Sequence, residues 1–193
     1  MKKLKKSTLI AAIALVAISF ASSNLNAQSF EKSDFDLNFQ VGFGHAWYYG
    51  TYYKGGLPFI SVGADYALRD DWGPGVFGIG GVVGVSTVKT EYSYYNGTYG
   101  YRYTSFSIVP RATYHYQFID KLDTYAGVAT GITIRSGKEY GDYPYDIPDD
   151  SGARFVISAF AGVKYYLTDN FSVMSEIYVY DLATFNIGVG LKF

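Results

Sequence analysis

The sequence predicts an all-β chain that folds as an eight-stranded antiparallel up-and-down transmembrane β-barrel. Three observations lead to this prediction: apolar and polar residues alternate with a period of two, charged residues make up only 17% of the chain, and tight connections are interspersed with long ones. A period of two belongs to strands, because successive side chains of a strand point to opposite faces. An aromatic content of 19%, with 21 tyrosines, favours the same extended backbone.

The chain is expected to begin with an export signal over residues 1–27. Its first seven residues carry four lysines and no acid, residues 8–21 form an apolar run, and the polar segment that follows ends in the small Ala27. This order is that of a secretory signal peptide, and the apolar run is shorter than the roughly 20 residues that a transmembrane helix needs. Cleavage after Ala27 would leave a barrel domain over 28–193, lower the basic residues from 16 to 12 against 17 acidic residues, and give a formal charge of −5.

Eight segments after residue 27 alternate as strands do. The last one shows the pattern most clearly: over 184–193 the odd positions are Phe, Ile, Val, Leu and Phe, and the even positions are Thr, Asn, Gly, Gly and Lys. A helix would mix these two sets on every face. The predicted strands cover residues 35–44, 58–68, 75–88, 103–118, 122–135, 154–167, 171–180 and 184–193.

The connections between the strands differ in length. In an up-and-down outer-membrane barrel the short turns lie at the periplasmic rim and the long loops lie outside. We therefore expect both chain ends at the periplasmic rim and three long loops at the cell surface. The tight connections are 69–73, 119–121 and 168–170, and the long ones are 47–57, 89–101 and 136–152, with 181–183 as a short exception.

Alternation alone does not say which face points inward. A soluble lipocalin-like barrel buries its apolar face, whereas a membrane barrel turns it toward lipid. The polar face here consists of Gly, Ser, Thr and Asn with isolated charges. That composition suits the narrow interior of an eight-stranded barrel better than a surface in water. Eight spans of about 10 residues also leave room for loops, whereas sixteen would leave none.

The segment 162–193 resembles the closing part of the small outer-membrane β-barrel family, the group that contains OmpX and the OmpA membrane domain. The resemblance implies the same barrel over 28–193 without a periplasmic peptidoglycan-binding domain, and it implies that Phe193 is the signal read by the outer-membrane assembly machinery. Pro110 departs from the pattern because it cannot donate to a strand ladder, so we expect a bulge there. Ser175 departs from it by taking a lipid-facing place. The matching features are a glycine before the Tyr165–Tyr166 pair, the Thr-Asp-Asn turn at 168–170, the inward Glu176 and the alternating end at Phe193.

Five charged residues on the polar face would be enclosed by the barrel. Buried charges need partners, because leaving one unpaired costs of the order of several kcal/mol. We expect an ion-pair network that fills the interior. A narrow or gated pore is the alternative, although eight strands leave little room for one. The five residues are Asp65, Arg111, Lys164, Glu176 and Lys192.

Two histidines, His45 and His115, raise the second alternative of a lipid-modifying barrel enzyme. Lipid A deacylase and palmitoyltransferase barrels resemble this chain in size and fold, and they use His with Ser and a carboxylate. A nucleophile needs its base within hydrogen-bond reach. Gln117 stands two residues after His115, where the deacylase pattern has a serine, and Trp47 stands two residues after His45. We therefore expect no enzyme and no catalytic residue.

Composition excludes other classes. The chain has no cysteine, which excludes a disulfide scaffold, a cysteine zinc site and a cysteine-linked lipoprotein anchor. The formal net charge is −1, and no basic cluster follows the first residues, so we expect no nucleic-acid partner. Gly78 and Gly80 precede no helix and are read as strand glycines, not as a phosphate loop. We expect no cofactor and no metal site.

The long loops are rich in tyrosine. Tyrosine gives a large contact area at a low entropic cost, so these loops predict a binding rim for an extracellular glycan or protein. An equally weighted interpretation is that the tyrosines extend the strands and form an aromatic girdle. The aspartates of 142–150 either hold calcium or bridge to cations on lipopolysaccharide. The binding candidates are Tyr48, Tyr52, Tyr94, Tyr99, Tyr143 and Tyr145.

Together these features predict a monomeric protein of the cell outer membrane with a structural or surface-interaction role. Its expected partners are outer-membrane lipids and lipopolysaccharide, the outer-membrane assembly machinery, and an extracellular glycan or protein ligand.

Overall fold

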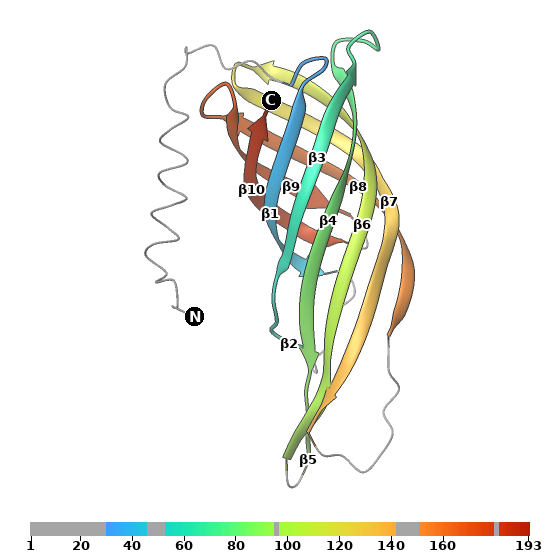
Figure 1. Cartoon of the computed structure of the whole chain (residues 1–193). Helices are drawn as coiled ribbons and strands as arrows, with labels where there is room; N and C mark the ends of the chain where they lie inside the picture. Colours follow the sequence, from blue (N-terminus) through green and yellow to red (C-terminus); the bar gives the residue numbers. More distant parts are fainter. Residues whose placement is uncertain (1–29, 46–52, 95–96, 142–150, 180–181) are drawn as a thin grey trace, which may run out of the picture.

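The computed structural model describes residues 30–45, 53–94, 97–141, 151–179 and 182–193, and this part of the chain is all β. Its ten strands form one antiparallel sheet in the order β2-β4-β3-β1-β10-β9-β8-β7-β6-β5, and a further pairing of β4 with β6 closes the sheet into a ring (Figure 1). Eight strands build the ring, so the predicted eight-stranded barrel is confirmed. They are β1 (Phe35–His45), β3 (Phe59–Arg69), β4 (Val76–Thr90), β6 (Gly97–Ile119), β7 (Leu122–Tyr140), β8 (Gly152–Tyr166), β9 (Phe171–Tyr178) and β10 (Ala183–Lys192), and the short β2 (Tyr53–Lys54) and β5 (Tyr92–Tyr94) pair with β4 and β6.

Both ends of the barrel lie at the rim that carries the tight turns. The Phe35 amide donates to the Phe193 carbonyl at 3.1 Å, and the Phe193 amide donates back to the Phe35 carbonyl at 2.8 Å. The connections 70–75, 120–121 and 167–170 lie at this same rim, which we call the turn rim. The opposite rim, where β2 and β5 lie, is called the loop rim (Figure 1).

The barrel wall is uneven in height, and here the prediction of loops was partly wrong. Much of 89–101 and 136–152 is strand: β4 continues to Thr90, β6 starts at Gly97 and has 23 residues, and β7 has 19. On the other side of the ring, β9 has 8 residues and β10 has 10. The extra residues of β4, β6 and β7 are chiefly Tyr, Thr, Gly and charged residues, and none is aliphatic, so apolar alternation does not reveal these parts of the strands.

The expected bulge at Pro110 is also wrong. Pro110 pairs with Gly81 of β4, and the β6–β7 register is the same on both sides of it, with Ile108 opposite Ile132 and Arg111 opposite Ala129. A proline lacks only one ladder donor, and the strand tolerates that loss without an extra residue. The irregularities in register lie near the turn rim instead, between Ala67 and Arg69 and between Gln117 and Ile119.

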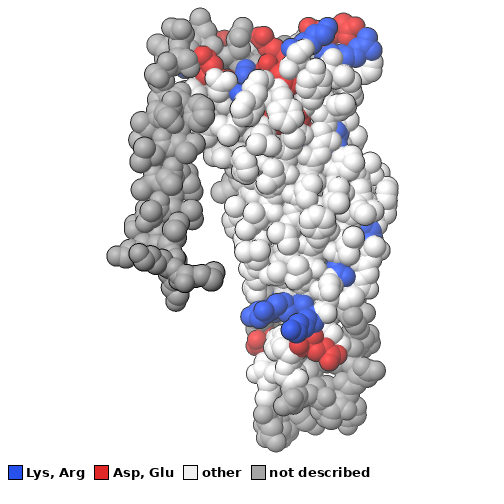
Figure 2. Space-filling model, viewed as in Figure 1, with Lys and Arg blue, Asp and Glu red and all other residues white. Residues whose placement is uncertain are grey.

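The apolar set faces outward and the polar set faces inward. Phe39, Ile108 and Ile157 are 42%, 44% and 63% exposed, whereas the interior Asn38 and Arg111 are 0% and 4% exposed. The contiguous apolar surface formed by these outward residues is far larger than the exposed apolar patches of soluble monomers, which measure about a few hundred Å². The described surface is white over most of the wall in Figure 2, with few charges between the rims. The lipocalin-like alternative is therefore excluded, and the barrel has the surface of a transmembrane barrel.

The height of this surface suits a membrane. On β6 the outward positions from Tyr116 to Phe106 are aromatic or aliphatic, with Pro110 and Ala112 among them. Ten residue steps of about 3.4 Å, tilted by about 40°, rise about 25 Å, which is the height of the apolar band in outer-membrane barrels. We call the outward apolar residues of the ring strands the apolar belt. In the described part of the chain, no helix is long and apolar enough to cross a membrane.

Candidate functional site

Arg111 lies at the centre of the barrel interior and joins strands from opposite sides. Its Nε donates to Asp65 Oδ1 at 2.8 Å, a second guanidinium nitrogen donates to the other oxygen of Asp65, and Nη1 donates to Glu176 Oε1 at 2.9 Å. Gly80 of β4 lies between Asp65 on β3 and Arg111 on β6 in the sheet register. A side chain at Gly80 would overlap the Asp65 carboxylate, so this glycine leaves the space in which the two charges meet.

Neutral donors give the two carboxylates further hydrogen bonds. Glu176 accepts hydrogen bonds from Gln40 Nε2 at 2.9 Å, from the Tyr125 hydroxyl at 2.7 Å and from the Tyr178 hydroxyl at 3.1 Å. Asp65 accepts one from Asn38 Nδ2 at 2.9 Å. The result is a network in which each charge has both an opposite charge and a polar partner, which is what charges out of contact with water require.

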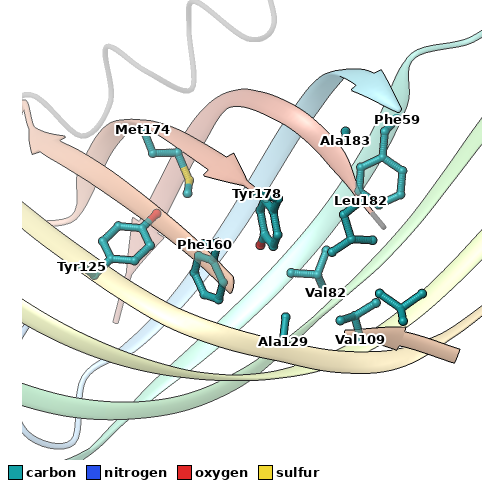
Figure 3. Packing of buried hydrophobic residues seen from close by; sticks show 11 residues of the cluster. Phe59, Val82, Val109, Tyr125, Ala129, Phe160, Met174, Tyr178, Leu182 and Ala183 are labelled. Carbon is teal, nitrogen blue, oxygen red and sulfur yellow. The ribbon is translucent and has the colours of Figure 1, made fainter. Parts of the chain in front are cut away.

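Aromatic rings also pack inside the lumen, and Figure 3 shows Tyr125, Phe160 and Tyr178 within the buried hydrophobic cluster. Phe160 stacks on Tyr178 at 4.8 Å and meets Tyr125 edge-on at 6.4 Å. The Arg111 guanidinium lies 5.4 Å from the centre of the Phe160 ring. Side chains from β6, β7, β8 and β9 therefore meet across the lumen and fill it, as expected for the interior of an eight-stranded barrel.

Lys164 of β8 joins the same network toward the turn rim. It forms a fully buried ion pair with Asp36 of β1, and Asp65 lies 4.0 Å from its ammonium nitrogen. Four of the five charges that the sequence singled out are thus brought together. Lys192 is not among them, because it pairs with Asp34 at 3.4 Å at the turn rim. Asp36 was missed, although its place on the polar face of β1 was a signal that could have found it.

His115 lies in a buried chain of hydrogen bonds that the sequence interpretation did not find. Its Nδ1 is 2.7 Å from Asp123 Oδ2, and its Nε2 is 3.0 Å from Thr113 Oγ1. A hydroxyl, an imidazole and a carboxylate in line can pass a proton, but Thr113 is 1% exposed and the Phe30 ring lies 4.3 Å from the imidazole. The arrangement therefore offers no open side to a substrate. His45 ends β1 at the loop rim, so the two histidines stand at opposite ends of the barrel.

At the loop rim the tall part of the wall carries tyrosines in pairs. Tyr92 of β5 stacks on Tyr99 of β6 at 5.6 Å, and Tyr101 stacks on Tyr103 at 5.5 Å. The Tyr101 hydroxyl donates to Glu139 Oε1 at 2.5 Å. Of the predicted binding candidates, Tyr99 lies in β6 and is half-buried, and Tyr94 ends β5. Tyr48, Tyr52, Tyr143, Tyr145 and the aspartates of 142–150 lie outside the described residues.

The predicted assembly signal, Phe193, lies at the turn rim. Phe193 is 69% exposed at the turn rim, and its ring lies 6.4 Å from that of Phe35. Among the described residues, no group of three or more histidine or carboxylate side chains is arranged to hold a metal ion.

Comparison with known proteins supports the architecture. No protein-family model matches the chain, and no curated protein sequence matches it. Among solved structures, the attachment invasion locus protein Ail of Yersinia pestis, in complex with the heparin analogue sucrose octasulfate, superposes with a TM-score of 0.51 and 13% identity over 84% of this chain and 100% of Ail. OprG of Pseudomonas aeruginosa has a TM-score of 0.49 and 11% identity over 86% of this chain and 98% of OprG. The N-terminal barrel of OprF from the same species has a TM-score of 0.44 and 20% identity over 84% of this chain and 98% of the OprF barrel. The likeness to Ail, at 13% identity, concerns the fold alone.

Proposed function

We propose that this chain is an exported, monomeric integral protein of the outer membrane whose loop rim binds an extracellular glycan or protein. Residues 1–27 act as the signal peptide, and residues 28–193 form the barrel. The turn rim faces the periplasm, and Phe193 is recognised there by the assembly machinery. The apolar belt and the barrel fold support this location.

One observation carries the binding role. Strands β4, β6 and β7 continue as a paired sheet beyond the apolar belt, and this extension carries the half-buried stacked pair Tyr92–Tyr99 beyond the buried pair Tyr101–Tyr103. A membrane anchor alone needs no such extension. Rigid tyrosines supply apolar faces for sugar rings or side chains together with hydroxyl groups that hydrogen-bond. The heparin analogue bound by Ail is a precedent, within the same fold, for a glycan-like ligand.

The same interior argues against the two alternatives. A conducting path would have to pass the Arg111 network and the Tyr125–Phe160–Tyr178 packing. An enzyme would need a reactive group within reach of substrate, and the Thr113–His115–Asp123 chain is enclosed. We expect no channel conductance in planar bilayers, either for the natural chain or after Glu176→Gln, and an unchanged lipid A mass spectrum after His115→Ala or His45→Ala.

The test of the proposal is ligand binding by the refolded barrel in nanodiscs, using a panel of neutral oligosaccharides and heparin fragments as probes. We expect at least one probe to bind, and Tyr92→Ala with Tyr99→Ala to weaken that binding tenfold or more. The matched control is Tyr114→Ala with Tyr116→Ala, which removes two tyrosines near the turn rim. Absence of binding to the whole panel and to extracellular proteins, or equal loss in the control, would refute the role.

A further inference from the structure

The outward face of β4, β6 and β7 ends in three aligned rows at the loop-rim edge of the apolar belt. Each row contains one residue from each strand, and the sheet register places the three directly opposite one another. The first row is apolar, the second carries hydroxyl groups, and the third, which we call the basic row, carries three cations. The rows are Val85, Phe106 and Ile134, then Thr87, Thr104 and Ser136, then Lys89, Arg102 and Lys138.

The basic row projects to the outside of the barrel. Arg102 and Lys138 are exposed and Lys89 is half-buried, whereas the neighbours Val88, Tyr101 and Tyr103 are buried. The backbone of Lys54 in β2 pairs with that of Lys89. Figure 2 shows Lys and Arg side chains gathered where the white surface of the wall ends, with Asp and Glu side chains beside them toward the loop rim.

The row lies just beyond the lipid headgroups, and its long side chains can reach back to them. Each of the three cations stands four residues beyond the first-row residue of its own strand, which is Val85, Phe106 or Ile134. At about 3.4 Å per residue and a tilt of about 40°, four residues rise about 10 Å above the edge of the belt. The headgroup layer of a bilayer extends about 5–8 Å beyond the hydrocarbon on each side, and long basic side chains bend toward it.

Three cations side by side destabilise a sheet unless an anion lies over them. Residues directly opposite in neighbouring antiparallel strands have Cβ atoms about 5 Å apart, and like charges there repel. Among the described residues, no carboxylate forms an ion pair with any of the three. Glu91 lies two residues beyond Lys89, on the side away from the belt, and Glu139 accepts the Tyr101 hydroxyl.

We propose that the basic row and the hydroxyl row together bind the phosphate groups of an anionic glycolipid of the lipid A type in the outer leaflet. Guanidinium, ammonium and hydroxyl groups are the side chains that hold phosphate oxygens. Thr87 Oγ1 accepts the Leu57 amide at 2.8 Å, so its own hydroxyl proton remains to be donated. The ligand is a lipid and not a soluble anion, because the row stands directly above Val85, Phe106 and Ile134, where acyl chains pack.

The proposal rests on the outer-membrane location in the proposed function, and it does not depend on ligand binding by the tyrosines. Refolding is carried out in phosphatidylcholine vesicles with or without bisphosphorylated lipid A, for the natural chain and for Lys89→Gln/Arg102→Gln/Lys138→Gln. The readouts are the urea midpoint of unfolding and the amount of lipid A that copurifies. Lys32→Gln/Arg69→Gln, which removes two cations near the turn rim, is the matched control.

We expect the difference in urea midpoint between the triple variant and the natural chain to depend on the lipid. In phosphatidylcholine alone, the triple variant unfolds at the same urea concentration as the natural chain or a higher one, because a like-charge row has been removed. With lipid A, the natural chain becomes more stable and the triple variant does not. Each surface cation near an anionic leaflet contributes about fivefold in affinity, so the three predict about a hundredfold loss of lipid A binding. The control follows the natural chain in both lipids.

Three outcomes would overturn the proposal. The first is equal stabilisation of the natural chain and the triple variant by lipid A. The second is that inorganic phosphate at millimolar concentration stabilises the natural chain as much as lipid A does. The third is that soluble heparin, and not lipid A, loses binding in the triple variant, which would make the row a site for a sulfated glycan. Loss of glycan binding in the tyrosine variants leaves both readouts unchanged, so the two proposals fail independently.

Discussion

Replacing Arg111 by Met is expected to destabilise the barrel strongly. The substitution keeps an unbranched side chain of similar length but leaves Asp65 and Glu176 without the cation that both of them contact. Removing one partner of a buried ion pair costs about 3–5 kcal/mol, because the charge that remains is buried without a partner.

The chain offers a control with the same geometry in water. Arg69 makes a bidentate contact with Asp71, with Nε and Nη2 each 2.9 Å from a carboxylate oxygen, but the side chains are 46% and 59% exposed. The Arg69 guanidinium lowers the pKa of the Asp71 carboxyl below its usual value. The ion pair is therefore fully formed at a pH above the usual pKa of an aspartate, and it is lost as the pH falls through the lowered pKa. Water screens such pairs, and we expect Arg69→Met to cause no measurable change at neutral pH.

The assay is equilibrium unfolding in urea of barrels refolded into phosphatidylcholine vesicles, followed by tryptophan fluorescence and by heat-modifiable gel mobility. Arg111→Met should lower the free energy of unfolding by about 3–5 kcal/mol, and Arg69→Met should not lower it. Equal effects of the two substitutions would refute the reasoning, because they would mean that water reaches the Arg111 network as freely as the surface.

Three other substitutions test the packing and the assembly signal. Gly162→Ala should lower the free energy of unfolding by about 1–3 kcal/mol in the same urea assay, because an added Cβ overlaps the Tyr125 ring and moves its hydroxyl away from Glu176. The control Gly97→Ala should be neutral, because a Cβ there meets nothing within 4 Å. A neutral Gly162→Ala would mean that the lumen is loosely packed. Phe30→Ala should cost about 3 kcal/mol, the lower end for deleting a buried phenylalanine, since Phe30 is 1% exposed against His115; a cost below about 1 kcal/mol would show that the segment before β1 is not part of the core. Phe193→Ala should slow assembly in cells, measured by pulse-chase of the heat-resistant gel band, while refolding in vesicles is unchanged, and equal slowing in both would point to folding instead of recognition.

The sequence predicted the faces of the strands well and the partners across the lumen poorly. A period of two assigns each residue to one face, and this sufficed to place Asp65, Arg111, Lys164 and Glu176 inside. It does not say which inward residues meet, because that depends on the tilt and stagger of the closed sheet. Asp36 and Lys164 are 128 positions apart in the chain, and only closure of the barrel brings them together.

Two other differences have local causes. The tall wall at the loop rim was predicted as loops, because Tyr, Thr and Gly extend β4, β6 and β7 without adding apolar residues. The Thr113–His115–Asp123 chain was missed because the deacylase pattern has only a serine two residues after the histidine. Thr113 stands two residues before His115 on the same face of β6, and Asp123 lies across the tight turn on β7. The alternation of strand faces could therefore have predicted both neighbours of His115.

We expect the interior charges also to specify the register of the sheet. A slip of one residue in a strand exchanges its two faces, and a slip of β6 would turn Arg111 toward lipid at a cost of about 2–4 kcal/mol near the midplane. The neutral triple variant Arg111→Met/Asp65→Asn/Glu176→Gln tests this role, because it leaves no buried charge unpaired and should recover most of the stability lost in Arg111→Met. We expect it to recover stability and to lose uniqueness of register.

Register can be measured directly because the chain has no cysteine. Thr104 of β6 and Ser136 of β7 lie directly opposite each other, so cysteines introduced there should form a disulfide only in the native register. We expect nearly complete cross-linking in the natural background and a lower yield in the neutral triple variant at equal stability. An unchanged yield would show that the apolar belt alone sets the register, and the network would then be retained only to fill the lumen.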